Sequence, residues 1–383
     1  MKNIMNRLIA MLYKEFIYLI RDKKMRIIII AVPIIQAVLL GYAVNMDLKE
    51  VKTAVVNMDN SIESNEFIDS FFSSNTFTPV SAANMHQAEE LVLGGKALMI
   101  IVIPKGFSEQ LKNNRTAPVQ VILDATNSVN AGMASGYIVN LITKYNTEYI
   151  ESKTGYKNSM GVDVEYRTWF NNNFESKNFF VPSMLAMLLM IVTVMLSGMA
   201  IVQEKESGTL EQLTVSPITA WEFIIGKSIP FAIVSFIDVL LIIAISVFWF
   251  GIKVTGSFSL LLFASVLYIM CTLGIGLLIS AISSTQQQAT MSMFMIIFPV
   301  ILLSGFAFPI VNMPEVIQWI TYINPMRYYL DVIVGVFLKG LYFDRLQDPV
   351  FALFILSVLY IGLAALYLRK KLKLLKSKVK IKA

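Results

Sequence analysis

The sequence contains almost none of the residues from which most metal and redox sites are built. It has a single cysteine, Cys271, and a single histidine, His86. One cysteine cannot form a disulfide within the chain, and one residue of each kind cannot supply a His/Cys metal cluster. A disulfide framework and a zinc-finger type of metal site are therefore excluded within one chain. His86 stands near Glu89 and Glu90 in the sequence, and we interpret it as a surface residue.

Charged residues are also scarce in this chain. They make up 15% of the 383 residues, against about 25% in soluble domains, and 56% of the residues are hydrophobic. This composition predicts an integral membrane protein. The net charge is +6, and fifteen of the 32 Lys and Arg residues lie in residues 1–26 and 369–383. Basic termini of this kind favour contact with anionic lipid at a cytoplasmic membrane face over binding of nucleic acid.

Six apolar runs predict six membrane-spanning helices, because a bilayer core of about 30 Å needs roughly 20 residues of helix. We place them at residues 27–45, 180–202, 229–250, 259–282, 291–310 and 350–368. No A-x-A cleavage pattern follows the first run, which we therefore interpret as an uncleaved anchor rather than a signal peptide. Six spans put both termini on one side, and their Lys and Arg residues predict that this side is the cytoplasm.

Residues 46–178 separate the first two spans and are long enough to form a domain outside the membrane. The stretches "VKTAVVNMD", "ALMIIVIP" and "APVQVILDATNS" predict strands, while "SIESNEFIDSFFSS" predicts a helix capped by Asn60 or Ser61. "VDVEYRTWF" alternates and is expected to lead back to the membrane. The expected fold class is an α-helical membrane protein of six spans that carries an α/β, or α+β, extracytoplasmic domain.

Residues 311–345 are too apolar for an ordinary loop and too often interrupted for a span. The prolines that interrupt this region are Pro309, Pro314 and Pro325. We expect two short half-helices that enter the outer leaflet and cap a central pathway, because broken backbone at that depth must pack on protein or a wet cavity. Asn324, before Pro325, is expected to break the hairpin, and Arg327 is spaced to pair with Asp331.

Two polar residues fall inside predicted spans. Asp238 lies near the middle of the third, at a cost of about 2.5 to 3.5 kcal/mol on insertion scales, and Gln36 interrupts the first. We favour a hydrogen bond between helices, from Asp238 to Gln36 or Ser235, and keep a proton site or a substrate contact as the alternative. Four glycines are expected to allow close helix packing: Gly198, Gly274, Gly276 and Gly305.

The polar loop 203–227 ends in Gly226-Lys227-Ser228, a fragment of a phosphate-binding loop. Trp221 stands where the first glycine of that motif belongs, and a predicted span follows the fragment. We therefore expect no ATP site, no other cofactor and no metal on this chain. Within the loop, Leu210 and Leu213 would share one face of a short amphipathic helix. That helix could turn the chain at the membrane surface or present a surface to a cytosolic partner.

Four stretches in the second half of the chain resemble a known family. They are "EKESGTLEQL", "STQQQA", "LSGFAFPIVNMP" and "INPMRYYL". In this order and spacing they look like the permease subunit of a type 2 ABC exporter, in the subfamily with a large outer domain between its first two spans. The resemblance covers nearly the whole chain.

The resemblance implies an assembly in the bacterial inner membrane. Two six-span permease chains, identical or different, would pair, and each would dock a cytosolic ABC ATPase subunit that holds ATP and Mg²⁺. Relatives export drugs, lipids or other amphipathic compounds, often with a periplasmic adaptor protein. Residues 1–26 would be the cytosolic connecting helix, residues 179–368 would carry spans two to six, and 369–383 would be a basic, lipid-facing tail.

The resemblance also assigns residues to two sites. The ATPase-coupling helix would contain Glu204, Lys205, Glu206, Gly208, Thr209, Leu210, Glu211 and Gln212. The re-entrant outer gate would contain Pro309, Pro314, Asn324, Pro325 and Arg327.

Two other functions remain as alternatives. A proton-coupled secondary transporter would use Asp238 as its relay, although the sequence lacks the paired ionisable residues or the inverted repeat that such a protein is expected to have. A membrane sensor would bind a ligand on its outer domain and signal through the 203–227 loop.

Overall fold

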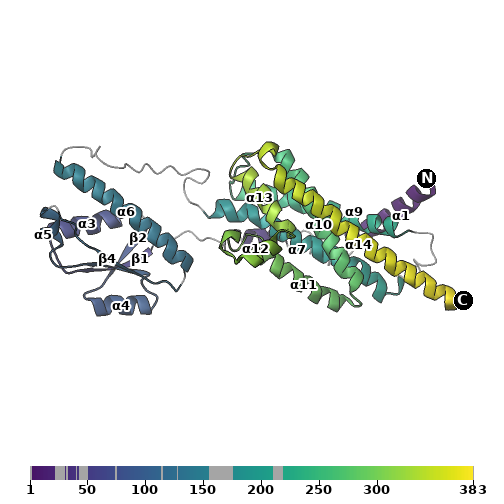
Figure 1. Ribbon diagram of the computed structural model, residues 1–383, viewed down its shortest axis with the longest axis horizontal. Coiled ribbons are helices and arrows are strands. Elements are labelled where there is room, and N and C mark those ends of the chain that lie inside the picture. Colours follow the sequence, from purple (N-terminus) through teal and green to yellow (C-terminus); the bar gives the residue numbers. More distant parts are fainter. Residues whose placement is uncertain are drawn as a thin grey trace. The chain divides into compact units, whose positions relative to one another are not determined.

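The computed structural model of the protein describes residues 2–21, 31, 33–39, 41–42, 51–73, 76–113, 115–126, 128–154, 176–209 and 219–382. Contacts divide the chain into two compact units (Figure 1). The helical unit comprises Met1–Asn45 and Trp169–Ala383, and the smaller α/β unit comprises Met46–Thr168.

The described part of the helical unit consists mainly of long apolar helices. In chain order its elements are α1 (Lys2–Arg21), α7 (Lys177–Glu206), α9 (Ala220–Ala244) with the π-helical turn η1 (Ile245–Trp249), α10 (Phe258–Ile282), α11 (Gln286–Leu302), η2 (Ile310–Asn312), α12 (Glu315–Thr321), α13 (Pro325–Phe337), η3 (Phe343–Arg345) and α14 (Gln347–Lys382). Residues 33–39, in the first predicted span, are helical, and the rest of that span lies largely outside the described residues.

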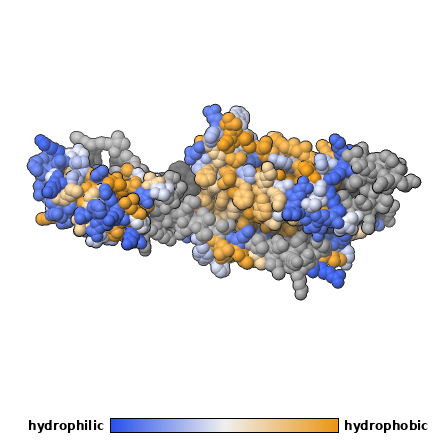
Figure 2. All heavy atoms as spheres, turned by 90° about the horizontal axis from the view of Figure 1, so that it is seen from below, coloured by the Kyte–Doolittle hydropathy of each residue, from blue (hydrophilic) through white to orange (hydrophobic). Residues whose placement is uncertain are grey.

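Four of the described helices are long and apolar enough to cross a membrane. They are Lys177–Glu206, Trp221–Trp249, Phe258–Ile282 and Gln347–Lys371. The fifth predicted span, 291–310, is the shorter helix α11. Large hydrophobic side chains also lie exposed on the outside of the bundle, as on Phe248, Met295 and Phe351, and Figure 2 shows this apolar surface over the helical unit. Apolar residues on all sides are expected of helices that face lipid.

The third span begins nine residues before the predicted start at 229. Thr219 caps α9 by accepting from the Glu222 N–H at 3.3 Å, and the Glu222 carboxylate accepts from the Thr219 N–H at 2.6 Å. This reciprocal capping box satisfies two backbone donors at the helix start. The polar residues at 219–227 therefore belong to the first turns of α9, whereas their polarity alone suggests a loop.

Close contacts at small residues hold the helical unit together. A Cβ at Gly274 of α10 would lie 2.7 Å from the backbone of Tyr360 in α14, and one at Gly276 would collide with Ser197 of α7. Gly198 likewise faces Met293 of α11. The predicted packing role is thus confirmed for these three glycines. Gly305 differs, because its φ of 93° marks a turn with a left-handed backbone.

The α/β unit contains a four-stranded sheet with helices on both faces. Its elements are β1 (Val51–Asn57), α3 (Ile62–Phe72), β2 (Phe77–Ser81), α4 (Met85–Leu93), β3 (Met99–Ile103), α5 (Phe107–Lys112), β4 (Gln120–Leu123) and α6 (Ser128–Thr154). The strand order is β2-β1-β3-β4, with β1 parallel to β2 and β3, and β4 antiparallel to β3. Figure 1 shows α3, α5 and α6 over one face of the sheet and α4 over the other.

Strand β3 lies inside the sheet, between β1 and β4, and both of its faces are buried. Met99, Ile101 and Ile103 pack under α3, α5 and α6, whereas Ile100 and Val102 pack toward α4. A continuous apolar run is expected for a strand that is covered on both sides. Ser61 caps α3, accepting from the Ser64 N–H at 3.1 Å, which is one of the two predicted caps. The sequence analysis missed β2 and α4, and the predicted strand "VDVEYRTWF" lies outside the described residues.

Replacing Asp59 with asparagine is expected to weaken the junction between β1 and the turn before α5. The Asp59 carboxylate accepts from the Ser61 hydroxyl at 2.5 Å and from the N–H groups of Gly106 and Ser108 at 2.8 and 3.2 Å. The Ser61 hydrogen bond, helped by these backbone donors and opposed by desolvation, lowers the pKa of Asp59 below its usual 3.8. The stabilisation is therefore present above the unfolded-state pKa and is lost as the pH falls through the folded-state value.

Hydrogen-exchange protection factors of the Gly106 and Ser108 amides in the full chain, at pH 7 and pH 4, would measure this effect. We expect Asp59→Asn to lower protection at pH 7 and to remove most of its dependence on pH. Asp69→Asn, at an exposed position on α3, is the matched control. Equal protection in both variants would show that the carboxylate does not stabilise this junction.

Candidate functional site

The last turn of α7 belongs to a cluster of four charged side chains, three of them largely buried. The Glu204 carboxylate accepts from the Lys227 ammonium of α9 at 3.1 Å and from the Lys14 ammonium of α1 at 3.2 Å. Lys227 also pairs with Glu15 of α1 at 2.9 Å, and the two side chains are only 8% and 3% exposed. Two carboxylates and two ammonium groups balance each other, as buried charges require. The cluster joins α1, α7 and α9.

Lys205, the next residue, attaches α7 to α10. Its ammonium donates to the carbonyl oxygens of Ala281 at 2.9 Å and of Ser283. Lys371 of α14 donates to the same Ala281 carbonyl at 2.6 Å. These carbonyls lie at the C-terminal end of α10, where backbone acceptors lack helical partners and the helix dipole has its negative end. Two ammonium groups therefore satisfy the end of α10.

Glu206 attaches α7 to α11. Its carboxylate accepts from the Gln286 N–H at 2.8 Å and from the Gln286 side-chain amide. Gln286 is the first residue of α11, so the carboxylate lies at the positive end of that helix. Three consecutive residues, Glu204, Lys205 and Glu206, thus contact four other helices, and we call them the α7 terminal turn. They form the end of a span rather than part of a separate coupling helix.

Helix α1 reaches this cluster through a close contact with α9. Met11 lies against Gly226, where a Cβ would come within 2.6 Å of the Met11 sulfur. Glu15 is four residues further on, so it lies on the same face of α1 and meets Lys227. Gly226 and Lys227 therefore serve helix packing and ion pairing in α9, and the lysine of this phosphate-loop fragment is held by two carboxylates.

The other predicted coupling residues follow the α7 terminal turn. Gly208 has a φ of 71°, a left-handed conformation that glycine adopts readily. The Thr209 hydroxyl donates to the Glu204 carboxylate and to the Glu204 carbonyl, the latter at 3.2 Å. Leu210, Glu211 and Gln212 lie outside the described residues, so the amphipathic coupling helix stays a prediction.

The predicted gate residues lie in the broken segment between α11 and α14. Pro309 and Pro314 stand directly before η2 and α12. Asn324 caps α13 by accepting from the Met326 N–H at 2.9 Å, and Pro325 is the first residue of that helix. The Asn324 amide also donates to the Val300 carbonyl at 2.8 Å. Asn324 therefore both starts α13 and attaches it to α11.

Arg327 turns back toward α12. Its guanidinium donates to the Thr321 hydroxyl and lies 4.4 Å from the centre of the Tyr322 ring, a cation–π contact. The predicted ion pair with Asp331 is wrong, since no such pair forms in the described part of the chain. The guanidinium instead joins the two short helices of the hairpin.

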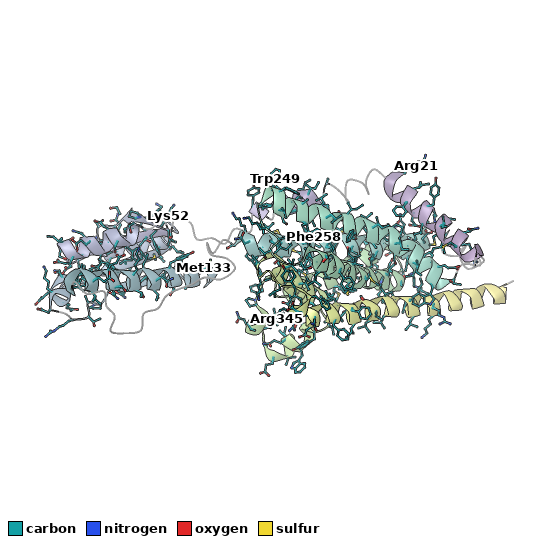
Figure 3. All side chains as sticks on the ribbon, turned by 90° about the horizontal axis from the view of Figure 1, so that it is seen from above. Arg21, Lys52, Met133, Trp249, Phe258 and Arg345 are labelled. Carbon is teal, nitrogen blue, oxygen red and sulfur yellow. The ribbon has the colours of Figure 1, made fainter. Side chains whose placement is uncertain are left out.

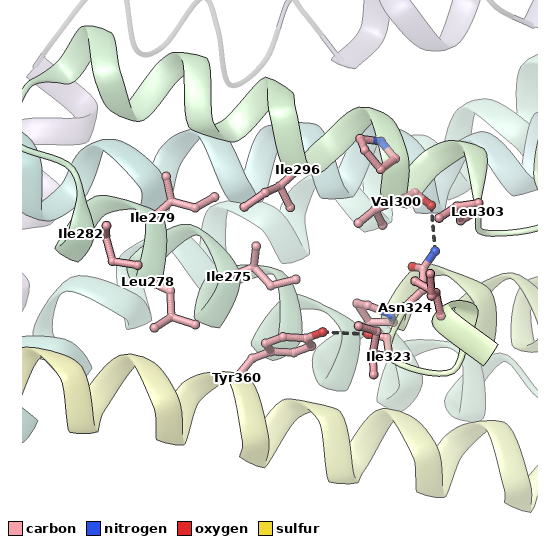
Figure 4. Close-up of a pocket in the computed structure, with 13 residues that line it drawn as sticks. Ile275, Leu278, Ile279, Ile282, Ile296, Val300, Leu303, Ile323, Asn324 and Tyr360 are labelled. Atoms are coloured by element: carbon pink, nitrogen blue, oxygen red, sulfur yellow. Dashed lines mark hydrogen bonds between the residues drawn. The ribbon is translucent and has the colours of Figure 1, made fainter. Parts of the chain in front are cut away.

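An apolar cavity of about 390 Å³ lies beside this hairpin (Figure 4). Aliphatic side chains of α10 and α11, such as Ile279 and Ile296, form its sides, and Ile323 and Asn324 close one end. Tyr360 of α14 lines it too, and its hydroxyl donates to the Ile323 carbonyl at 2.7 Å. The side-chain amide of Asn324 and the hydroxyl of Tyr360 are both engaged with the backbone, so the cavity presents an apolar surface.

Each of the two polar residues inside predicted spans has one buried oxygen without a hydrogen-bond partner among the described residues. Asp238, in α9, is 1% exposed, and its Oδ2 has no hydrogen-bond partner among the described residues. The same holds for Oε1 of Gln36. Ser235 instead accepts from the Thr193 hydroxyl of α7 at 2.9 Å. The predicted hydrogen bond from Asp238 to Gln36 or Ser235 is therefore absent in the described part of the chain.

A match to a known family covers both the α7 terminal turn and the hairpin. The family model described as "ABC-2 family transporter protein" matches residues 23–366. The chain belongs to this ABC-2 transporter family. The predicted resemblance to an ABC permease is therefore confirmed, and the chain is an ABC-2 permease.

Relatives in Escherichia coli strain K12 match over nearly their whole length. "Probable multidrug ABC transporter permease YbhR" is 34% identical over 353 residues, which is 92% of this chain and 95% of the relative. "Probable multidrug ABC transporter permease YbhS" is 30% identical over 368 residues, or 96% and 97% of the two chains. "Inner membrane transport permease YhhJ" is 25% identical over 321 residues, or 83% and 84%.

The sequence analysis missed the partners of the α7 terminal turn. Lys14, Glu15 and Lys227 lie far from Glu204 in the sequence, and nothing local indicates that they meet. One signal was available, because Glu15 falls on the apolar face of α1, four residues after Met11. An acid on such a face predicts a buried basic partner.

Replacing Lys227 with methionine is expected to destabilise this ABC-2 permease by about 3–5 kcal/mol, because two buried carboxylates lose their shared partner. Lys14→Gln is the matched control. It removes a cation from the same Glu204, but the Lys14 side chain is 66% exposed, so we expect a cost of about 0–1 kcal/mol. Unfolding of the purified variants in mixed detergent micelles measures both values. Equal losses would contradict the buried-cluster interpretation.

Asn324→Ala is expected to destabilise the start of α13 by about 1–2 kcal/mol, through loss of a helix cap and of the bond to Val300. Asn324→Asp should keep the cap, since aspartate caps equally well, and lose only the donor to Val300. Exchange of the Met326 amide separates the two, because it should accelerate in the alanine variant alone. Asn312→Ala, at an exposed position in η2, is the control and should change neither the stability nor the exchange of the Met326 amide.

Proposed function

We propose that this ABC-2 permease is the membrane subunit of an ATP-driven exporter and that a separate cytosolic ABC ATPase supplies its energy. The observation that carries the proposal is the α7 terminal turn. It attaches α7 to four helices directly before residues 207–209, the described segment that follows α7. A partner that moved this segment would therefore act on α1, α9, α10 and α11 together.

The arrangement of charge supports a cytoplasmic location for this end of the helical unit. Helix α1 and the C-terminal part of α14 lie at the same end (Figure 1), and both are rich in Lys and Arg. The opposite end carries aromatic side chains. Trp249 and Arg345 lie there, away from Arg21 (Figure 3), and Trp249 donates to the Tyr42 hydroxyl at 3.1 Å. Basic residues inside and an aromatic belt at the interface are the usual signs of orientation.

This orientation would place the α/β unit outside the cytoplasm and the hairpin of α12 and α13 at the outer side. The proposed substrate is an amphipathic small molecule, drug or lipid-like compound. Two observations support this class, namely the apolar cavity beside the hairpin and the multidrug permease names of the two E. coli relatives. A second permease chain, identical or different, would complete the pathway, and a periplasmic adaptor could meet the α/β unit.

Glu211→Lys is expected to leave the chain inserted and folded but to abolish ATP-driven export, because the proposed coupling helix would lose its match to the ATPase. Glu206→Lys should also prevent export. It would in addition place a cation at the start of α11, so we expect reduced stability in this variant alone. Affinity purification from membranes measures the association with the ATPase, and transport into inverted vesicles measures export. A cytosolic ATPase that co-purifies and export that fails would support the proposal.

A proton-coupled transporter is the second candidate, favoured by the buried Asp238 carboxyl with its unpartnered Oδ2. In that case Asp238→Asn would abolish transport, and a proton gradient would drive transport without ATP. For an ATP-driven exporter we expect the asparagine variant to remain active, since the amide is nearly isosteric. Transport driven by a proton gradient alone, with no ATPase present, would exclude the first proposal.

A further inference from the structure

The α/β unit contains a cavity that the transport proposal leaves without a role. Its volume is about 540 Å³, within the range of small-molecule sites. Helix α3 contributes Phe67, α5 contributes Phe107, and α6 contributes Ile142 and Tyr145. The segment between α5 and β4 closes the remaining side with Arg115 and its neighbours.

The cavity is lined by aromatic rings that pack against one another. The Phe67 ring lies 4.9 Å from the Tyr145 ring in an edge-to-face arrangement and 5.8 Å from the Phe107 ring. Tyr145 and Tyr149 stack with ring centres 6.0 Å apart. Aromatic side chains offer large apolar area at little conformational cost, which suits them to hold the apolar body of a ligand.

The charge at the edge of the cavity is positive. Of the described residues that line it, Arg115 alone carries a charge, and no described carboxylate lies within ion-pair distance of it. Lys112, nearby on α5, is instead neutralised by Glu63 at 2.8 Å. An exposed guanidinium at the edge of an aromatic cavity is suited to bind a carboxylate, sulfonate or phosphate.

The cavity contains a second polar group, the hydroxyl of Tyr145. The Tyr145 hydroxyl is shielded from solvent and has no hydrogen-bond partner among the described residues. Burial, with smaller contributions from Tyr149, Glu66 and Glu63, raises the pKa of Tyr145 to about 12, so the hydroxyl keeps its proton at neutral pH. A buried donor without an acceptor is costly, and a ligand oxygen would relieve that cost.

We infer that the α/β unit binds an anionic amphiphile in this cavity, with its apolar body against Phe67 and Phe107 and its anionic group on Arg115. The cavity belongs to the α/β unit, whereas the proposed transport pathway belongs to the helical unit. The inference concerns binding alone, so it can fail while the export proposal stands, and the reverse is also possible.

The test uses the full chain in nanodiscs of zwitterionic phosphatidylcholine. The probes are dodecanoate and dodecyl-trimethylammonium, each with a diazirine on its chain, and peptide mass spectrometry locates the label. We expect the carboxylate to label residues 107–119 and 142–150, and the ammonium probe to label them far less. Arg115→Gln should reduce carboxylate labelling there by about tenfold, through loss of one charge-assisted contact.

Two further variants separate binding from folding. Lys144→Gln removes an exposed cation of α6 that pairs with Glu148 at 3.7 Å and does not line the cavity, so labelling should not change. Ile142→Phe should fill part of the cavity and reduce carboxylate labelling while the exchange protection of β3 is kept. Equal labelling by the two probes would overturn the inference. So would label confined to the helical unit, or equal effects of Arg115→Gln and Lys144→Gln.

Discussion

The helical unit depends on the charges at the end of α7. Glu204, Lys205 and Glu206 point to different neighbours, and together they reach α1, α9, α10 and α11. Each contact uses a general property of helices or buried charge. Glu204 completes a neutral cluster with Glu15 and two lysines, Lys205 satisfies the carbonyl end of α10, and Glu206 lies at the amino end of α11. If one of these four helices moved separately from α7, a charged contact of the α7 terminal turn would be broken.

This attachment has a consequence for the proposed mechanism. Two helices meet the hairpin away from this charged end, where Asn324 joins α13 to α11 and Tyr360 joins α14 to the α12–α13 junction. Helices α11 and α14 thus run from the charged end to the hairpin beside the apolar cavity. We propose that a movement imposed on the α7 terminal turn is carried along these helices to the hairpin. Such coupling requires two states with different contacts at both ends.

The length of the apolar runs was sufficient to locate four of the six predicted spans as long apolar helices, because burial in lipid imposes length and composition on each span separately. The packing glycines and the Ser61 cap were also predictable, because the signal for each lies in the local sequence. The start of α9 was predicted wrongly, because Lys227 and Glu222 make it look like a loop while their partners lie on α1. The partners of the α7 terminal turn, the direction of Arg327 and the lack of a described partner for Oδ2 of Asp238 depend on tertiary contacts that no local pattern records.

The most direct test of the account is ATP-driven export by a reconstituted complex that carries Glu204→Gln, with ATP hydrolysis followed in the same vesicles. The glutamine keeps the size of the side chain and an oxygen that can accept from the Thr209 hydroxyl, but it removes the charge that Lys227 and Lys14 share. The account predicts that hydrolysis continues while export falls sharply, because the ATPase no longer moves α1 and α9 together. Normal export by this variant would contradict the central role of the α7 terminal turn.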